Sequence, residues 1–116
     1  RRRQRQMCIR DRYKFGEVHS LANQIQVAED HPQFHRIFEN SNGGVVLLAL
    51  ESGQKLDEHL APAELMVNVI EGSIEFTMID KPHTINTGEF MLVGKGVPHS
   101  VVAKADSKVM LIKVKA

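Results

Sequence analysis

Residues 53–72 read GQKLDEHLAPAELMVNVIEG and decide the fold of this chain, because they bring a histidine, a proline corner and an apolar strand together ahead of a glycine turn. Residues 88–99, GEFMLVGKGVPH, show a similar pattern, with an acidic residue after glycine, an apolar strand, a Gly-x-Gly turn and a second histidine. Short apolar runs bounded by glycine and proline predict buried β-strands. Both stretches therefore predict a buried strand close to a histidine, His59 in the first and His99 in the second.

The first stretch resembles the first of the two motifs of the cupins, which are small β-barrels with a site in the barrel mouth. Gly53, His59 and Gly72 stand at motif positions. Ala61 and Leu65 stand where the family carries a second histidine and a glutamate, so two of this motif's three metal ligands are missing. The resemblance therefore implies a cupin with a degenerate metal motif.

The second stretch, extended to residue 103, resembles the second cupin motif. Gly88, Gly96 and His99 match that motif. Gly94 and Ala103 stand where the family usually has a proline and an asparagine. The two motifs together imply a single-domain, all-β fold with little helix, namely the jelly-roll barrel that is also called a double-stranded β-helix.

Short apolar or alternating runs recur along the chain about every eight to twelve residues, which is the pattern of an all-β sandwich or barrel. The similarity to the cupins covers about residues 45–115. Residues 13–116 are long enough for one core, so we predict one barrel domain. We expect strands at residues 33–38, 45–50, 65–70, 73–79, 84–86, 90–93, 99–104 and 109–113, an extended piece at 13–18, one helical turn at 20–24 and a loop at 80–82.

Residues 1–12 differ from the rest of the chain in composition. They contain six Arg and one Asp, and they resemble one reading frame of a transposon-end adapter used to build sequencing libraries, so we interpret them as a non-native tail. Without them Lys and Arg fall from 15 to 9, Asp and Glu fall from 14 to 13, and the formal charge moves from +1 to −4. The rest of the chain therefore has no basic cluster that indicates nucleic-acid binding.

The composition also argues against several other classes. The sole cysteine, Cys8, lies in that tail, so the barrel has no thiol for a disulfide, a nucleophile or a metal ligand. No apolar run approaches the roughly 20 residues of a membrane span. The arginine-rich start lacks the apolar core of a secretory signal. We therefore expect a cytoplasmic protein with no membrane partner.

Side chains alternate along a strand, so parity predicts which residues share the inward face with the two histidines. Glu64 falls one residue from the motif position and should point outward. An apolar lining with two imidazoles at the mouth is the general form of a small-molecule site. A histidine on an apolar face is also a common hydrogen-bonded core residue. The predicted ligand pocket is lined by His59, Ala61, Leu65, Val67, His99 and Val101.

Three classes of function compete for this pocket. A metal-dependent cupin enzyme, of dioxygenase or isomerase type, relies on three or four protein donors, whereas only His59 and His99 are present. A non-catalytic module for a small metabolite or sugar needs only the pocket and the two histidines, and we favour it. A regulatory protein built on a plain scaffold is the third class. A divalent ion, Zn, Ni, Mn or Fe, is expected to bind weakly at most through His59 and His99.

The resemblance also implies a homodimer, since single-domain cupins are commonly dimeric. Residues 33–38 are a predicted edge strand, whose unpaired backbone groups a second copy could satisfy. The expected partners are therefore a small-molecule ligand and a second copy of the chain.

Overall fold

The computed structural model describes residues 13–116, so the interpretation of residues 1–12 as a non-native tail lies outside the described residues. Within the described part, strands dominate, and the one short helix is η3 (Leu21–Gln24), a 3-10 turn. This confirms the prediction of an all-β fold with little helix. Among residues 13–116 no helix is long and apolar enough to cross a membrane. The strands are β1 (Gln33–Asn40), β2 (Gly43–Leu50), β3 (Lys55–Leu60), β4 (Glu64–Glu71), β5 (Ser73–Met78), β6 (Lys81–Asn86), β7 (Phe90–Val93), β8 (Pro98–Ala103) and β9 (Ser107–Val114).

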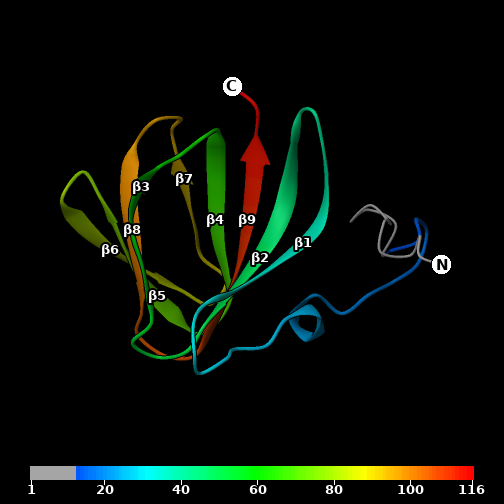
Figure 1. The fold of residues 1–116 in the computed structure, drawn as a ribbon, viewed down its shortest axis with the longest axis horizontal. Helices are drawn as coiled ribbons and strands as arrows, with labels where there is room; N and C mark the ends of the chain where they lie inside the picture. Colours follow the sequence, from blue (N-terminus) through cyan, green and yellow to red (C-terminus); the bar gives the residue numbers. More distant parts are fainter. Residues whose placement is uncertain (1–12) are drawn as a thin grey trace.

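The strands form two antiparallel sheets that face each other as the halves of a barrel (Figure 1). The first sheet has the order β1-β2-β9-β4-β7, and the second has the order β3-β8-β5-β6. From β2 to β5, and again from β6 to β9, each strand lies in the sheet opposite its predecessor, which is the jelly-roll arrangement. β1 lies at the edge of the five-stranded sheet, as the sequence predicts for residues 33–38.

The main core lies between the two sheets. In β4 the alternate residues Leu65, Val67 and Val69 are buried, whereas Glu64 is exposed, so the predicted alternation is confirmed. Full burial of one such aliphatic side chain stabilises a fold by about 1.5–3 kcal/mol. Packing between the sheets therefore supplies most of the stability of the barrel. The core consists of Leu48, Leu50, Ala61, Leu65, Val67, Val69, Ile74, Phe76, Ile85, Val93, Val101, Ala103 and Val109.

Three glycines of the two motifs lie at turns with positive φ. Gly72, Gly88 and Gly96 have φ values of 93°, 85° and 80°. Residues with a Cβ resist this left-handed region. At Gly72 a Cβ would also collide with the backbone carbonyl of Asp106. The backbone therefore requires glycine at this turn for two separate reasons.

The β5–β6 hairpin differs from the loop predicted at residues 80–82. Its turn consists of Ile79 and Asp80, at φ values of 52° and 60°. Positive φ at both central residues is the type I′ geometry, which matches the twist of the flanking strands. Lys81 and Pro82 belong to β6 instead. A proline is tolerated there because β6 is an edge strand.

The extended piece predicted at residues 13–18 is also wrong. Phe15 and Gly16 form a turn, and no strand begins within the described residues 13–32 that precede β1. The helical turn predicted at residues 20–24 is confirmed by η3. Downstream of η3, Ile25 packs with Leu47 on the outer face of the five-stranded sheet. The N-terminal segment is therefore a cover for part of that outer face.

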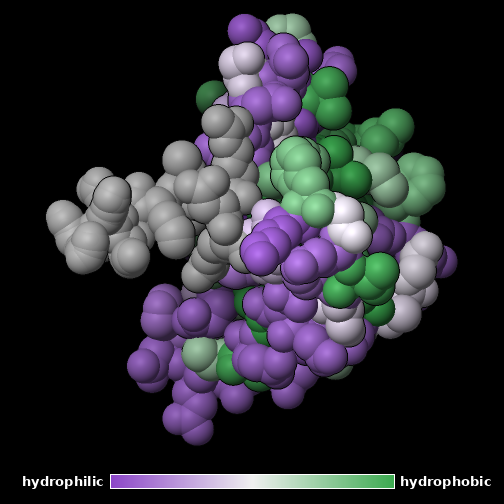
Figure 2. Space-filling model, turned by 90° about the vertical axis from the view of Figure 1, so that its right-hand side faces the viewer, coloured by the Kyte–Doolittle hydropathy of each residue, from purple (hydrophilic) through white to green (hydrophobic). Residues whose placement is uncertain are grey.

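The rest of the outer face of the five-stranded sheet exposes apolar side chains. Cross-strand pairing places Phe38, Val45, Ile112, Met66 and Leu92 on one row across the sheet. Side chains on such a row point to the same face. Figure 2 shows the side of the molecule that carries β1, where apolar residues lie at the surface between polar ones. An exposed apolar face of this kind is typical of an interaction surface. The large exposed side chains of this face include Phe38, Phe90, Leu92 and Val114.

Candidate functional site

His59 and His99 are direct cross-strand partners in β3 and β8. Their ring centroids are 4.2 Å apart, and the rings meet edge to face at 63°. The Nδ1 atom of His59 lies 2.9 Å from the carbonyl oxygen of Asp57, and the Nδ1 atom of His99 lies 3.0 Å from that of Val97. Because a carbonyl can only accept, both Nδ1 atoms carry the proton in the neutral rings. Each Nε2 atom therefore keeps its lone pair for a ligand.

A β-bulge in β3 allows His59 to face inward. β3 pairs with β8 at Leu56 and Val101 and next at His59 and His99, so β3 has one extra residue in this interval. In an unbroken strand Leu56 and His59 would point to opposite faces. The bulge restores them to one side, and both line the same cavity. The bulged residues Asp57 and Glu58 are exposed.

His99 is the buried member of the pair, with 3% of its surface exposed. Its ring stacks on Phe76 at a centroid distance of 5.3 Å and an interplanar angle of 18°. Burial lowers the pKa of His99, its bond to the Val97 carbonyl partly offsets this, and the nearby charge of protonated His59 lowers the pKa further. His99 is therefore neutral at neutral pH, in the form that offers Nε2 to a ligand.

The two rings border a cavity of about 50 Å³ inside the barrel. Five of the six predicted pocket residues line it, and Ala61 does not. Ala61 is buried in the adjacent core, and its carbonyl accepts a bond from the backbone N–H of Gly96. Apart from the histidines the lining is apolar. The lining residues are Leu48, Leu56, His59, Leu65, Val67, Ile74, Phe76, His99, Val101, Val109 and Leu111.

Several lining residues are absent from the sequence prediction. Leu56 could not be found by parity, because the bulge shifts the count between it and His59. Phe76 alternates with the buried Ile74 along β5, and Leu111 shares its face with the buried Val109 along β9. Strand periodicity, applied to those two strands, would have identified both.

Residues 46–115 of the sequence match the profile of the cupin domain. The chain belongs to the cupin family. A comparison with curated protein sequences found no match. The recognition of both motifs in the sequence is therefore confirmed at the level of the family.

Solved structures share the fold of this cupin. A conserved protein of unknown function from Streptococcus pyogenes has a TM-score of 0.81 and 21% identity, over 90% of this chain and 91% of that one. A cupin superfamily protein from Desulfitobacterium hafniense has a TM-score of 0.81 and 14% identity, over 89% and 94%. An RmlC-like cupin from Desulfovibrio desulfuricans has a TM-score of 0.76 and 24% identity, over 84% and 95%. These similarities concern the fold.

The histidine pair of this cupin offers two nitrogen donors to an ion. Ala61 and Leu65 contribute none, and in the described part of the chain no three His, Cys, Asp or Glu side chains come together as a metal site. Firmly held metals in enzymes usually have three or four protein ligands. The donor set therefore fits a weakly held ion and does not fit a firmly held catalytic metal.

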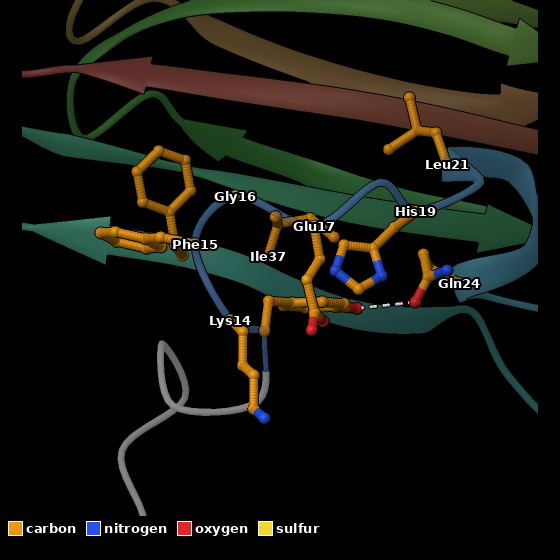
Figure 3. Close-up of a pocket in the computed structure, with 10 residues that line it drawn as sticks. Lys14, Phe15, Gly16, Glu17, His19, Leu21, Gln24 and Ile37 are labelled. Atoms are coloured by element: carbon orange, nitrogen blue, oxygen red, sulfur yellow. Dashed lines mark hydrogen bonds between the residues drawn. The ribbon is translucent and has the colours of Figure 1, made fainter.

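A larger hollow, of about 440 Å³, lies on the outer face of the five-stranded sheet, where the N-terminal segment passes over β1 (Figure 3). Phe15, Leu21 and Ile37 contribute apolar side chains to its lining. The hydroxyl group of Tyr13 donates to the Oε1 atom of Gln24 at 2.9 Å. Because this hollow lies outside the barrel, it is separate from the histidine pair.

Proposed function

We propose that this cupin is a non-catalytic barrel that binds a small metabolite or sugar at its histidine pair. The observation that carries the proposal is the meeting of two imidazole rings at an apolar cavity, each with Nδ1 bonded to a backbone carbonyl. The two Nε2 lone pairs accept hydrogen bonds from ligand hydroxyl groups, and the apolar walls contact the carbon skeleton.

The dimensions of the cavity limit how the ligand enters. About 50 Å³ is well below the roughly 300–1,000 Å³ of typical ligand pockets. The cavity therefore takes one end of the ligand. The remainder extends past His59, which is the exposed member of the pair, into the barrel mouth.

A divalent ion competes for the same two nitrogens. Zn, Ni, Mn or Fe binds through His59 and His99 and does so weakly, because two imidazoles are an incomplete donor set. A metal-dependent enzyme of dioxygenase or isomerase type is the alternative. The two-donor set disfavours it.

A thermal shift scan tests the proposal, with sorbitol as the hydroxylated probe and zinc, nickel and manganese as the ions. An ion that binds only the folded form stabilises it by about 2.7 kcal/mol at a hundredfold excess over its dissociation constant. The response should disappear in His59→Ala. It should also fade below about pH 6, because a protonated imidazole has no lone pair to offer.

The matched control is His31→Ala, since His31 is an exposed histidine outside the barrel. This variant should respond as the wild type does. A response in His59→Ala equal to that of the wild type would show that the pair is not a binding site. Both histidines would then be ordinary structural residues.

A further inference from the structure

We propose that the ligand of this cupin is an anion, namely a small hydroxylated carboxylate or phosphate ester, whose charged end is held by Lys95, Lys113 and Lys115 at the barrel mouth. The inference rests on the proposed function and adds the chemical class of the ligand. It starts from a hollow of about 390 Å³ that these three lysines line.

The hollow lies at the end of the barrel where several connections meet. Its walls come from the β1–β2 turn, from the β3–β4 loop at Pro62 and Ala63, and from the β7–β8 loop at Lys95. In Figure 1 these connections, together with the C-terminal end of β9, lie at the same end of the barrel. At about 390 Å³, the hollow is large enough for the part of a metabolite that the inner cavity cannot hold.

Within the described residues 13–116, the three ammonium groups have no partner of opposite charge. Among residues 13–116 no carboxylate lies within 4.0 Å of any of them, and Glu39, which also lines the hollow, is paired with Arg36 at 3.5 Å. Residues 13–116 have a formal charge of −4, with 9 Lys and Arg against 13 Asp and Glu. A concentration of unpaired positive charge in a net negative barrel attracts anions to this hollow.

The lysine hollow and the histidine cavity both have lining residues on the inner face of the five-stranded sheet. Lys113 follows Leu111 by two residues in β9, so it shares the inward face about 7 Å further along the strand. Leu111 lines the histidine cavity, and Leu65, the cross-strand partner of Lys113, lines it too. One ligand can therefore reach both sites.

A second link runs through the β7–β8 loop. Lys95 lies two residues before Val97, whose carbonyl accepts the Nδ1 proton of His99. The backbone N–H of Gly96 donates to the carbonyl of Ala61 at 2.8 Å, which ties this loop to the β3–β4 loop. The loop that orients His99 thus also carries a lysine of the rim.

The donors and acceptors define the ligand class. Ammonium groups donate to carboxylate or phosphate oxygens, and such charge-assisted bonds are the strong ones. The histidine Nε2 atoms accept from a hydroxyl group. A ligand that satisfies both ends bears an anionic group and a hydroxyl group on one carbon skeleton.

The test compares probes with the same six-carbon chain by isothermal titration calorimetry at low salt. Gluconate carries a carboxylate, sorbitol 6-phosphate carries a phosphate, and sorbitol is neutral. We expect at least one anion to bind about tenfold more tightly than sorbitol, with an advantage that shrinks as sodium chloride is raised. The anion that binds more tightly distinguishes a carboxylate ligand from a phosphate ester.

The variants locate the anion. The double variant Lys95→Gln with Lys113→Gln should weaken anion binding about tenfold and leave sorbitol unchanged. The matched control is Lys55→Gln with Lys104→Gln, which removes two charges at the opposite end of β3 and β8. It should stay within about twofold of the wild type.

The outcomes separate this inference from the proposed function. If neither anion binds more tightly than sorbitol, or if both double variants weaken anion binding equally, the anion class is wrong. Sorbitol binding that is lost in His59→Ala would then still support the histidine site. Anion binding that needs the lysines but ignores His59→Ala would overturn the bridge between the two ends.

Discussion

The burial difference between the two histidines predicts unequal effects on stability. His99 is 3% exposed and packs against Phe76. His59 is exposed and is held by one bond to the Asp57 carbonyl. Replacing each by alanine removes one ligand donor, so both variants should lose ligand binding. Only His99→Ala should also damage the core.

The magnitude follows from the contacts of each ring. His99→Ala loses a hydrogen bond of about 1 kcal/mol and a ring contact of about 0.5–1.5 kcal/mol. It also leaves a cavity beside the existing one, so a total of about 3 kcal/mol is expected. In a domain of this size that is a fall in melting temperature of roughly 10–15 °C. His59→Ala removes an exposed ring and should cost about 1 kcal/mol or less.

Urea unfolding at pH 8, where His99 is neutral, measures the two losses without ligand. His99→Gln is the informative companion, because its amide N–H can still donate to the Val97 carbonyl and should recover part of the stability. Equal losses in the two alanine variants, or a larger loss in His59→Ala, would refute the burial difference. The proposed depth of the site would then be wrong.

Three further predictions concern pH, assembly and the tail. Burial lowers the pKa of His99 in the folded state below 6.5. As the pH falls, the unfolded chain therefore binds the proton at a higher pH than the folded chain does. Neutral His99 contributes fully to the free energy of unfolding above about pH 6.5, and this contribution is lost as the pH falls toward the folded pKa. The urea midpoint should therefore decrease between pH 7.5 and 5.5, and less steeply in His99→Gln, whereas an equal slope in both proteins would exclude His99 as the cause. We also propose that a second copy covers the exposed apolar sheet face. Light scattering at micromolar concentration should then give twice the chain mass, and Leu92→Glu should give a monomer. A monomeric wild type would count against the dimer. Deleting residues 1–12 should leave the melting temperature unchanged, and a drop of several degrees would mean that they belong to the fold.

Local signals in the sequence were sufficient for most of the barrel. An apolar run between two glycine turns predicts a strand at residues 90–93, and these residues form β7. The signals failed where the turn chemistry is unusual. Ile79 and Asp80 adopt positive φ without a glycine, and the sequence pattern therefore predicts a loop that extends to Pro82. Residues 13–18 pass over the outer face of the five-stranded sheet, and Phe15 and Gly16 form a turn there instead of an extended piece.

The candidate site depends on both local and long-range features, and this explains which part the sequence could predict. Each histidine bonds to the carbonyl two residues before it, Asp57 for His59 and Val97 for His99. That bond orients the ring within its own strand. Whether the rings meet depends on the pairing of β3 with β8, and that pairing includes a bulge which parity cannot anticipate. The motif therefore predicts two oriented imidazoles, and the fold of the whole barrel is needed to bring them together at one cavity.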